Sequence, residues 1–129
     1  MLELSTSFHT GEPIRIRTIA EEHGIPSRFL VQILLQLKGA GFVASTRGAS
    51  GGYQLIKSPD EISLGEVMTV IEGQESEPGG AVAGKTPTAR VLNDTWREIA
   101  QVEHDALYGV TFGELVSRVK RQSENMFYI

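Results

Sequence analysis

Residues 14–55 read IRIRTIAEEHGIPSRFLVQILLQLKGAGFVASTRGASGGYQL, and this stretch decides the fold. Its first half has apolar residues at steps of three and four on both sides of Gly24, a pattern that predicts two short amphipathic helices. Residues 17–23 form the first, and Gly24 suits the left-handed residue that follows a helix end. Pro26 favours the start of the second helix, whose predicted apolar stripe is Phe29, Leu30, Ile33, Leu34 and Leu37.

Two short helices joined by a tight turn are typical of a helix-turn-helix motif. In that motif the second helix lies in the major groove of DNA with its N-terminal residues at the base edges. Here this helix offers Ser27, Arg28 and Gln32, whose side chains can hydrogen bond to bases. Arg17 and Lys38 complete the DNA-binding residues that we predict on the two helices.

After Gly41 the pattern changes from helical to extended. Residues 42–45 and 53–56 are predicted to form two short strands, and the glycine-rich segment TRGASGG forms the turn between them. A hairpin that follows a helix-turn-helix is a wing. Arg47 lies in its turn among small residues, so the guanidinium and nearby backbone can approach a phosphate or a minor groove. Ser50 and Gly51 are predicted to contact DNA with it.

These runs resemble the Rrf-type (Rrf-two) winged-helix transcriptional regulators, a family that includes regulators of iron–sulfur cluster assembly, cysteine metabolism and the nitric-oxide response. The similarity lies in IAEEHGIP, FLVQILLQLKGAGFV and RGASGGYQL and continues through SPDEISLGEVMTVIEG and TWREIAQVEHDALYGVTFGELV. It implies a mainly α fold with a small β-hairpin wing, in which a winged helix-turn-helix precedes a long C-terminal dimerisation helix. It also implies a sequence-specific, homodimeric DNA-binding regulator of transcription, and we expect a repressor.

The sequence departs from this family in three places. Residues 1–9 resemble only the last part of the family's longer first helix, with Leu2 and Phe8 as the expected inward side chains. Arg15 stands where the family tends to have a serine that caps the next helix, a contact typically worth about 1 kcal/mol. Cluster-binding relatives carry three cysteines before the long helix and, in some members, a histidine near its start. This chain has no cysteine and has Asn93 at the position aligned with that histidine.

Iron–sulfur clusters require thiolate or imidazole ligands, so we expect no cluster, no metal and no other cofactor. Glu75 and Glu77 could bind a hard cation, although a solvated loop is the more ordinary interpretation of these residues. The absence of cysteine also excludes disulfides and thiol-based redox sensing. The expected effector is therefore a small molecule or a partner at the loop and dimer interface, or none.

The C-terminal half combines two short helices with one long helix. Ser63–Glu66 and Thr111–Glu114 match the capping-box pattern that begins a helix. Residues 74–86 lack periodicity and are predicted to form a flexible loop. Thr86, Pro87 and Gly109 delimit the long helix, and its apolar seam comprises Leu92, Trp96, Ile99, Val102 and Ala106. Because no element of this small chain remains to cover the seam, we expect a second subunit to cover it.

Composition and charge limit the alternatives. The 129 residues fit one structural domain, divided here into a DNA-binding region 1–73, a loop 74–86 and a dimerisation region 87–129. The net charge is −4, but residues 1–58 hold six basic and four acidic residues, whereas the remainder holds six basic and twelve acidic ones. Basic charge thus favours the winged half, although only weakly. With neither a bilayer-length apolar run nor a signal-peptide pattern, we expect a cytoplasmic protein without membrane contact.

No enzyme motif emerges from the sequence. His9, His23 and His104 are scattered, and RGASGG lies between strands without the lysine and helix of a phosphate-binding loop. The competing interpretation is a winged-helix module that binds proteins and no longer binds DNA. Arg28, Gln32 and Arg47 favour DNA, whereas exposed apolar residues on the second helix would favour a protein partner. Phe29 and Val31 are ambiguous in this comparison.

Overall fold

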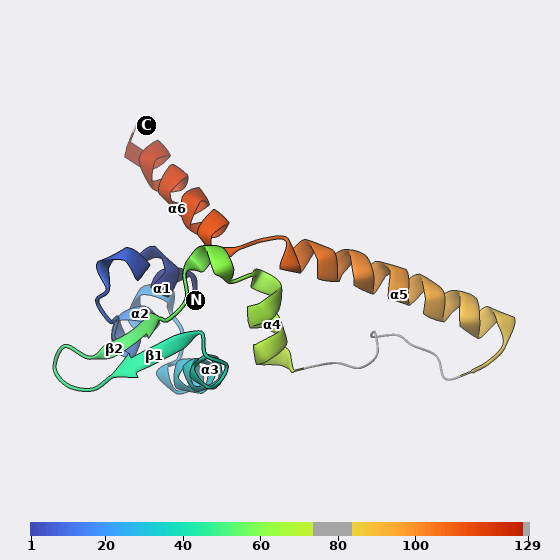
Figure 1. Ribbon diagram of the computed structural model, residues 1–129, viewed down its shortest axis with the longest axis horizontal. Coiled ribbons are helices and arrows are strands. Elements are labelled where there is room, and N and C mark those ends of the chain that lie inside the picture. Colours follow the sequence, from blue (N-terminus) through green and yellow to red (C-terminus); the bar gives the residue numbers. More distant parts are fainter. Residues whose placement is uncertain (74–83, 128–129) are drawn as a thin grey trace.

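The computed structural model describes residues 1–73 and 84–127 and shows a winged helix-turn-helix from which two longer helices project (Figure 1). The elements in chain order are α1 (Leu2–Thr6), the 3-10 helix η1 (Phe8–Thr10), α2 (Ile16–His23), α3 (Ser27–Gly39), β1 (Val43–Thr46), β2 (Gly52–Leu55), the 3-10 helix η2 (Pro59–Glu61), α4 (Leu64–Glu72), α5 (Pro87–Tyr108) and α6 (Phe112–Phe127). The predicted fold class is confirmed. The strands lie one residue from their predicted positions, and the loop predicted over 74–86 lies outside the described residues except for residues 84–86.

The core lies where α2, α3 and the hairpin meet α4 and α6. Helix α3 contributes Leu30, Leu34 and Leu37, which recur at helical spacing and are all buried. The other buried apolar side chains of this core are Leu4, Ile19, Ala20, Phe42, Val43, Leu55, Ile62, Val67 and Phe112. Phe29 was predicted to join this stripe, and that prediction is wrong: its side chain is 60% exposed.

The local signals at the helix ends act largely as predicted. Gly24 adopts the left-handed conformation with φ of 63° after α2. Ser63 and Glu66 form a complete capping box at α4, in which Ser63 N–H donates to Glu66 Oε2 at 2.9 Å and Glu66 N–H donates to Ser63 Oγ at 3.1 Å. At α6 only half of the predicted box forms, because the Glu114 carboxylate accepts a hydrogen bond from Arg118 at 2.6 Å. Helix α6 has 16 residues and is therefore longer than the short helix expected there.

The first helix packs through a different residue from those expected. Leu4 is buried at 2% exposure, whereas Leu2 and Phe8 are only partly buried against the core. Residues 8–10 form a separate 3-10 turn, which changes the direction of the chain after α1. The side chain that α1 buries in the core is therefore that of Leu4, the central residue of the helix.

Helix α5 begins with Thr86, whose Oγ1 accepts the N–H of Ala89 at 3.1 Å, and it runs away from the rest of the molecule (Figure 1). Its C-terminal end is anchored on α4. The ring of Tyr108 lies directly over Gly65, and the Tyr108 hydroxyl lies 2.8 Å from Thr69 Oγ1. The corner that follows pairs with the start of α4, because Leu64 N–H donates to Val110 O at 2.8 Å and Phe112 N–H donates to Ile62 O at 2.9 Å.

Neither α5 nor any other helix in the described ranges combines the length and apolar character needed to cross a membrane.

The contact between Gly65 and Tyr108 predicts a specific destabilisation. In Gly65→Ala, the new methyl group would overlap the Tyr108 ring, so the ring must move and release its hydroxyl contact with Thr69. We expect the free energy of unfolding to fall by about 1–3 kcal/mol, as for other overpacked sites, when it is measured by urea titration. Gly39→Ala is the matched control because nothing lies within 4 Å of the added atom. Equal stability of the two variants would contradict this account.

Candidate nucleic-acid interface

Helix α3 has one buried side and one exposed side. Leu30, Leu34 and Leu37 face the core, and Arg28, Gln32 and Ser27 are exposed, as a recognition helix requires. The side chains predicted to read bases are therefore all available to a ligand. Val31 is half-buried.

The same helix exposes more apolar surface than its periodicity predicted. Phe29 and Leu35 are 60% and 50% exposed. Phe29 precedes Ile33 by four residues, and this spacing suggested a shared apolar face. Only Ile33 packs against the core, because the core is centred on Leu30, Leu34 and Leu37 and Phe29 lies beyond its edge.

The hairpin after α3 forms a short antiparallel wing. Val43 pairs with Leu55 and Ser45 with Tyr53, so the strands converge on the turn that contains Arg47 and Ser50. Both of these residues are exposed. Gly51 differs from the prediction: it is buried, its N–H donates to Gly48 O at 3.1 Å, and a Cβ there would collide with Thr46 O. Gly51 therefore shapes the turn and does not offer its N–H to DNA.

A third segment supports the wing, and sequence patterns did not reveal it. Ile14 forms an antiparallel bridge with Tyr53, in which each N–H donates to the other residue's carbonyl oxygen at 2.8 Å. The two backbones approach so closely that a Cβ on Gly52 would collide with Ile14 O. The segment before α2 is thereby held against the wing near its turn.

This bridge places Arg15 beside the wing, which makes it a candidate residue that the sequence analysis missed. An open groove of about 460 Å³ is lined by residues 11–13, by Arg15 and by residues 49–51. Arg15 is exposed and occupies the N-cap position of α2 without a side-chain capping bond. The sequence did show an arginine at position 15 where the family tends to have serine. Only the fold shows that this arginine lies next to the wing.

Some basic side chains of this region already form an ion pair or hydrogen bond within the chain, and others do not. Arg17 pairs with Glu21 at 3.0 Å, and Lys38 Nζ donates to Ser45 Oγ at 2.7 Å. In contrast, no carboxylate among residues 1–73 and 84–127 lies within ion-pair distance of Arg15, Arg28 or Arg47, the ion pairs there being made by other residues. The three guanidinium groups of Arg15 at the N-cap of α2, Arg28 on α3 and Arg47 in the turn of the wing are thus free to bind an anionic ligand.

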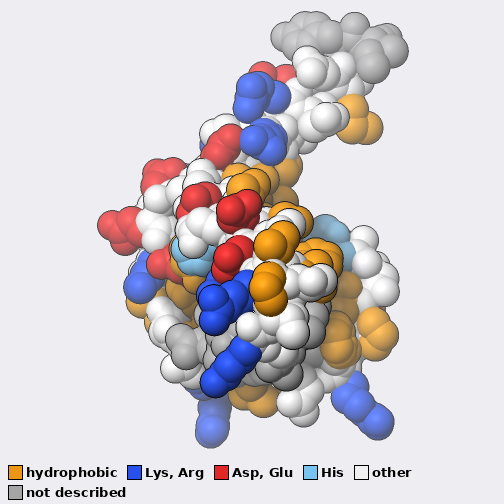
Figure 2. All heavy atoms as spheres, turned by 90° about the vertical axis from the view of Figure 1, so that its right-hand side faces the viewer, with side chains coloured by type: hydrophobic (Ala, Val, Ile, Leu, Met, Phe, Trp, Pro, Cys, Tyr) orange, Lys and Arg blue, Asp and Glu red, His pale blue; other side chains and the backbone are white. Residues whose placement is uncertain are grey.

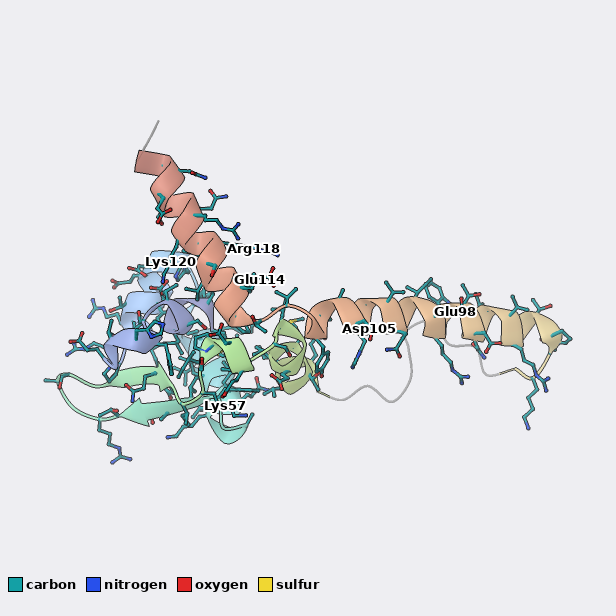
Figure 3. All side chains as sticks on the ribbon, turned by 45° about the horizontal axis from the view of Figure 1, so that its top comes forward. Lys57, Glu98, Asp105, Glu114, Arg118 and Lys120 are labelled. Carbon is teal, nitrogen blue, oxygen red and sulfur yellow. The ribbon has the colours of Figure 1, made fainter. Side chains whose placement is uncertain are left out.

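Helix α5 carries four acidic residues. Glu98 and Asp105 project from α5 in Figure 3, and Asp94 and Glu103 belong to the same helix. Figure 2 shows acidic side chains beside apolar ones on this side of the molecule, and basic side chains both at its lower edge and near its centre and on the helix that projects at the top. The charge separation expected from the sequence is only partial in space, because Glu12 lines the groove beside Arg15 and Glu21 and Glu22 belong to α2.

The apolar seam of α5 is open in the single chain. Trp96, Ile99 and Val102 are 37%, 51% and 71% exposed, and Leu92 and Ala106 are exposed as well. Only the C-terminal end of α5 packs on α4, through Tyr108. Most of this helix therefore extends from the molecule with its seam uncovered (Figure 1).

Comparison with known proteins agrees with this geometry. The model of a family described as "Rrf2: Iron-dependent Transcriptional regulator" matches residues 1–118. The HTH-type transcriptional regulator CymR of Bacillus subtilis is 34% identical over 130 residues, which cover 100% of this chain and 91% of CymR. The HTH-type transcriptional regulator IscR of Aliivibrio salmonicida is 32% identical over 123 residues, which cover 88% of this chain and 69% of IscR.

The solved structure of CymR, described as the global cysteine regulator of B. subtilis, superposes with a TM-score of 0.78 at 31% identity. The match covers 91% of this chain and 87% of the CymR chain. The same winged helix-turn-helix and long helix thus occur in a solved relative. This chain belongs to the Rrf2 family of transcriptional regulators.

Proposed function

We propose that this protein is a sequence-specific DNA-binding repressor that acts as a homodimer without an iron–sulfur cluster. The observation that carries the proposal is the set of free guanidinium groups of Arg15, Arg28 and Arg47 on three neighbouring elements of one winged helix-turn-helix. With α3 in the major groove, Arg28 and Gln32 meet base edges. Arg47 on the wing then meets the backbone or the adjacent minor groove.

Arg15 adds a contact with the backbone beside the wing. The Ile14–Tyr53 bridge fixes its position relative to the turn that carries Arg47, so both arginines can bind phosphates of one strand segment. Phosphate contacts set the register of the protein on DNA and carry no sequence information themselves. Ser27, Ser50, Lys38 and Arg17 lie around these contacts as weaker participants, the last two because each already has a partner in the chain.

A second copy of the chain is the proposed cover for the α5 seam. Leaving Trp96 or Ile99 in water forfeits roughly 1.5–3 kcal/mol for each side chain. A two-fold dimer through this seam would place two copies of α3 on successive major grooves, about one helical turn apart. Repression follows where such a site overlaps a promoter, because the dimer and RNA polymerase cannot occupy the same DNA.

The alternative module that binds proteins has one observation in its favour, the exposure of Phe29 and Leu35 on α3. Three free arginines around that helix and membership of a family of transcriptional regulators favour DNA instead. An effector, if there is one, is proposed to be a small molecule or a partner that acts at the dimer interface.

The family description names iron, but the residues of this chain do not fit an iron–sulfur cluster. No cysteine is present to supply thiolates. Among the described residues, Glu3, Glu22 and His23 do come together where α1 meets α2, with His23 Nε2 at 3.1 Å from Glu3 Oε2. One imidazole with two carboxylates does not supply the set of thiolate or imidazole ligands that a cluster requires. Glu75 and Glu77 lie outside the described residues.

The DNA-binding proposal predicts two classes of variant. After duplexes have been selected from random sequence at stated salt, Arg28→Ala and Gln32→Ala should each lower discrimination between duplexes by about 1–3 kcal/mol. Arg47→Ala and Arg15→Ala should weaken all duplexes alike, and each should reduce the slope of log K against log salt by about one per protomer. The measurement is a binding titration at several salt concentrations.

Arg118→Ala is the control, because it also removes one positive charge but from α6, where Arg118 is paired with Glu114 (Figure 3). It should leave affinity and salt slope unchanged. Unchanged binding by all four interface variants would contradict the proposed docking.

The dimer proposal is tested by light scattering at micromolar concentration. The protein should have the mass of two chains, and Trp96→Gln or Ile99→Gln should shift it towards one chain because each removes apolar surface from the seam. Arg97→Gln is the matched control on the same helix, since 3.6 residues per turn place it well away from Ile99. A monomeric wild-type protein would rule out this assembly.

The cluster-free proposal is tested by anaerobic reconstitution with iron and sulfide. We expect a colourless protein whose affinity for its selected duplex is the same with and without iron, because the chain supplies no thiolate. A cysteine-containing relative treated in parallel shows that reconstitution worked. A stoichiometric cluster with visible absorbance that changes DNA affinity would overturn the proposal.

A further inference from the structure

Phe29 is a large aromatic side chain at the start of the recognition helix, and it is exposed. It is the third residue of α3 and is 60% exposed, compared with 37% for Trp96 and 39% for Tyr108. Burial of such a side chain is worth about 1.5–3 kcal/mol, so its exposure on a surface that binds a ligand calls for a partner. The following steps rest on the DNA-binding function proposed above.

The neighbours of Phe29 show what kind of partner fits. On a helix, residues three, four and seven positions ahead share its face, and here these are Gln32, Ile33 and Gln36. Ile33 is half-buried and packs against the core, so the two glutamines are the exposed members. Arg28 precedes it and has no ion pair with the described carboxylates. The other exposed apolar residue of α3, Leu35, lies six positions away, on a different side. Phe29 is thus a single apolar group among hydrogen-bonding side chains, unlike a protein-docking patch, which joins several apolar side chains.

The major groove of DNA presents the same combination of groups. Its base edges are polar except for the C5-methyl group of thymine, which phenylalanine is suited to contact. A glutamine reads adenine by two hydrogen bonds, and every adenine is paired with a thymine. Side chains three positions apart on a helix are about 5–6 Å apart at Cβ, whereas successive base pairs are about 3.4 Å apart. A ring beside Gln32 therefore reaches the same base pair or the next one.

We propose that Phe29 is a specificity-determining residue that contacts a thymine C5-methyl group in the base pair read by Gln32 or in an adjacent one. Its ring then buries apolar surface only when the methyl group is present. At this position the protein would distinguish thymine from other bases by its methyl group, because Phe29 has no side-chain hydrogen-bonding group.

The test removes the methyl group and leaves the base pair intact. In the duplex selected by the wild-type protein, each thymine is replaced singly by uracil, which pairs with adenine as thymine does. One position in each half-site should weaken binding about fourfold, since one buried methyl-sized group is worth about 0.8 kcal/mol. This measurement needs no protein variant, so a folding defect cannot obscure it.

Phe29→Ala completes the comparison. It should bind the thymine duplex at least about fourfold more weakly than wild type does, and it should not distinguish thymine from uracil at the sensitive position. Ile56→Ala is the matched control, because Ile56 is 57% exposed, is also apolar and lies outside α3. It should retain the full response to uracil, and thermal melting should show that both variants are folded.

Two results would overturn the inference alone: specific binding by the wild-type protein that is insensitive to uracil at every position, or a Phe29→Ala variant that keeps the full uracil response. If no duplex can be selected at all, the proposed function fails and this inference fails with it.

Discussion

The geometry of the molecule depends on two backbone hydrogen bonds that join segments far apart in sequence. Leu64 N–H donates to Val110 O, and Phe112 N–H donates to Ile62 O. Ile62 and Phe112 are almost fully buried, at 0% and 4% exposure, so the bond between them is shielded from water, while Leu64 and Val110 are half-buried. Since unpaired buried backbone groups are costly, the two segments are held in one register. The start of α4, the end of α5 and the start of α6 are all fixed by this pairing.

Fixing the end of α5 matters because its contact with α4 sets the direction of the helix. Tyr108 packs over Gly65 and reaches Thr69, and beyond this contact α5 extends from the molecule (Figure 1). The direction of the apolar seam relative to α3 is therefore set by a few atoms at the base of α5. In a dimer formed through that seam, the same atoms would set the distance between the two recognition helices. Half-site spacing would then be a property of the α4–α5 junction.

The sequence predicted those features that depend on neighbouring residues. The capping box at Ser63, the Thr86 cap, and Gly24 after α2 are local signals, and each of them formed. The features that it missed depend on contacts between distant segments. The Ile14–Tyr53 bridge involves a single residue with no periodic pattern, and it alone brings Arg15 to the wing. Phe29 was wrongly predicted to be buried, because a helical stripe shows which side of the helix faces the core but not how far along the helix the core extends.

The charge distribution bears on how a protein with a net charge of −4 would bind DNA in the way proposed. Non-specific association is driven by the number of phosphates that basic groups neutralise, and a body with excess acid repels DNA from most of its surface. On the side formed by α2, α3 and the wing, Arg15, Arg28 and Arg47 offer guanidinium groups without carboxylate partners among the described residues. Arg90 and Arg121 are also unpaired, but they belong to the projecting helices α5 and α6 (Figure 1). In the proposed complex phosphate contacts are few, so a larger share of the binding free energy would come from base edges. That requirement gives the apolar ring of Phe29 and the carboxamide of Gln32 more weight than they would have on a strongly basic surface.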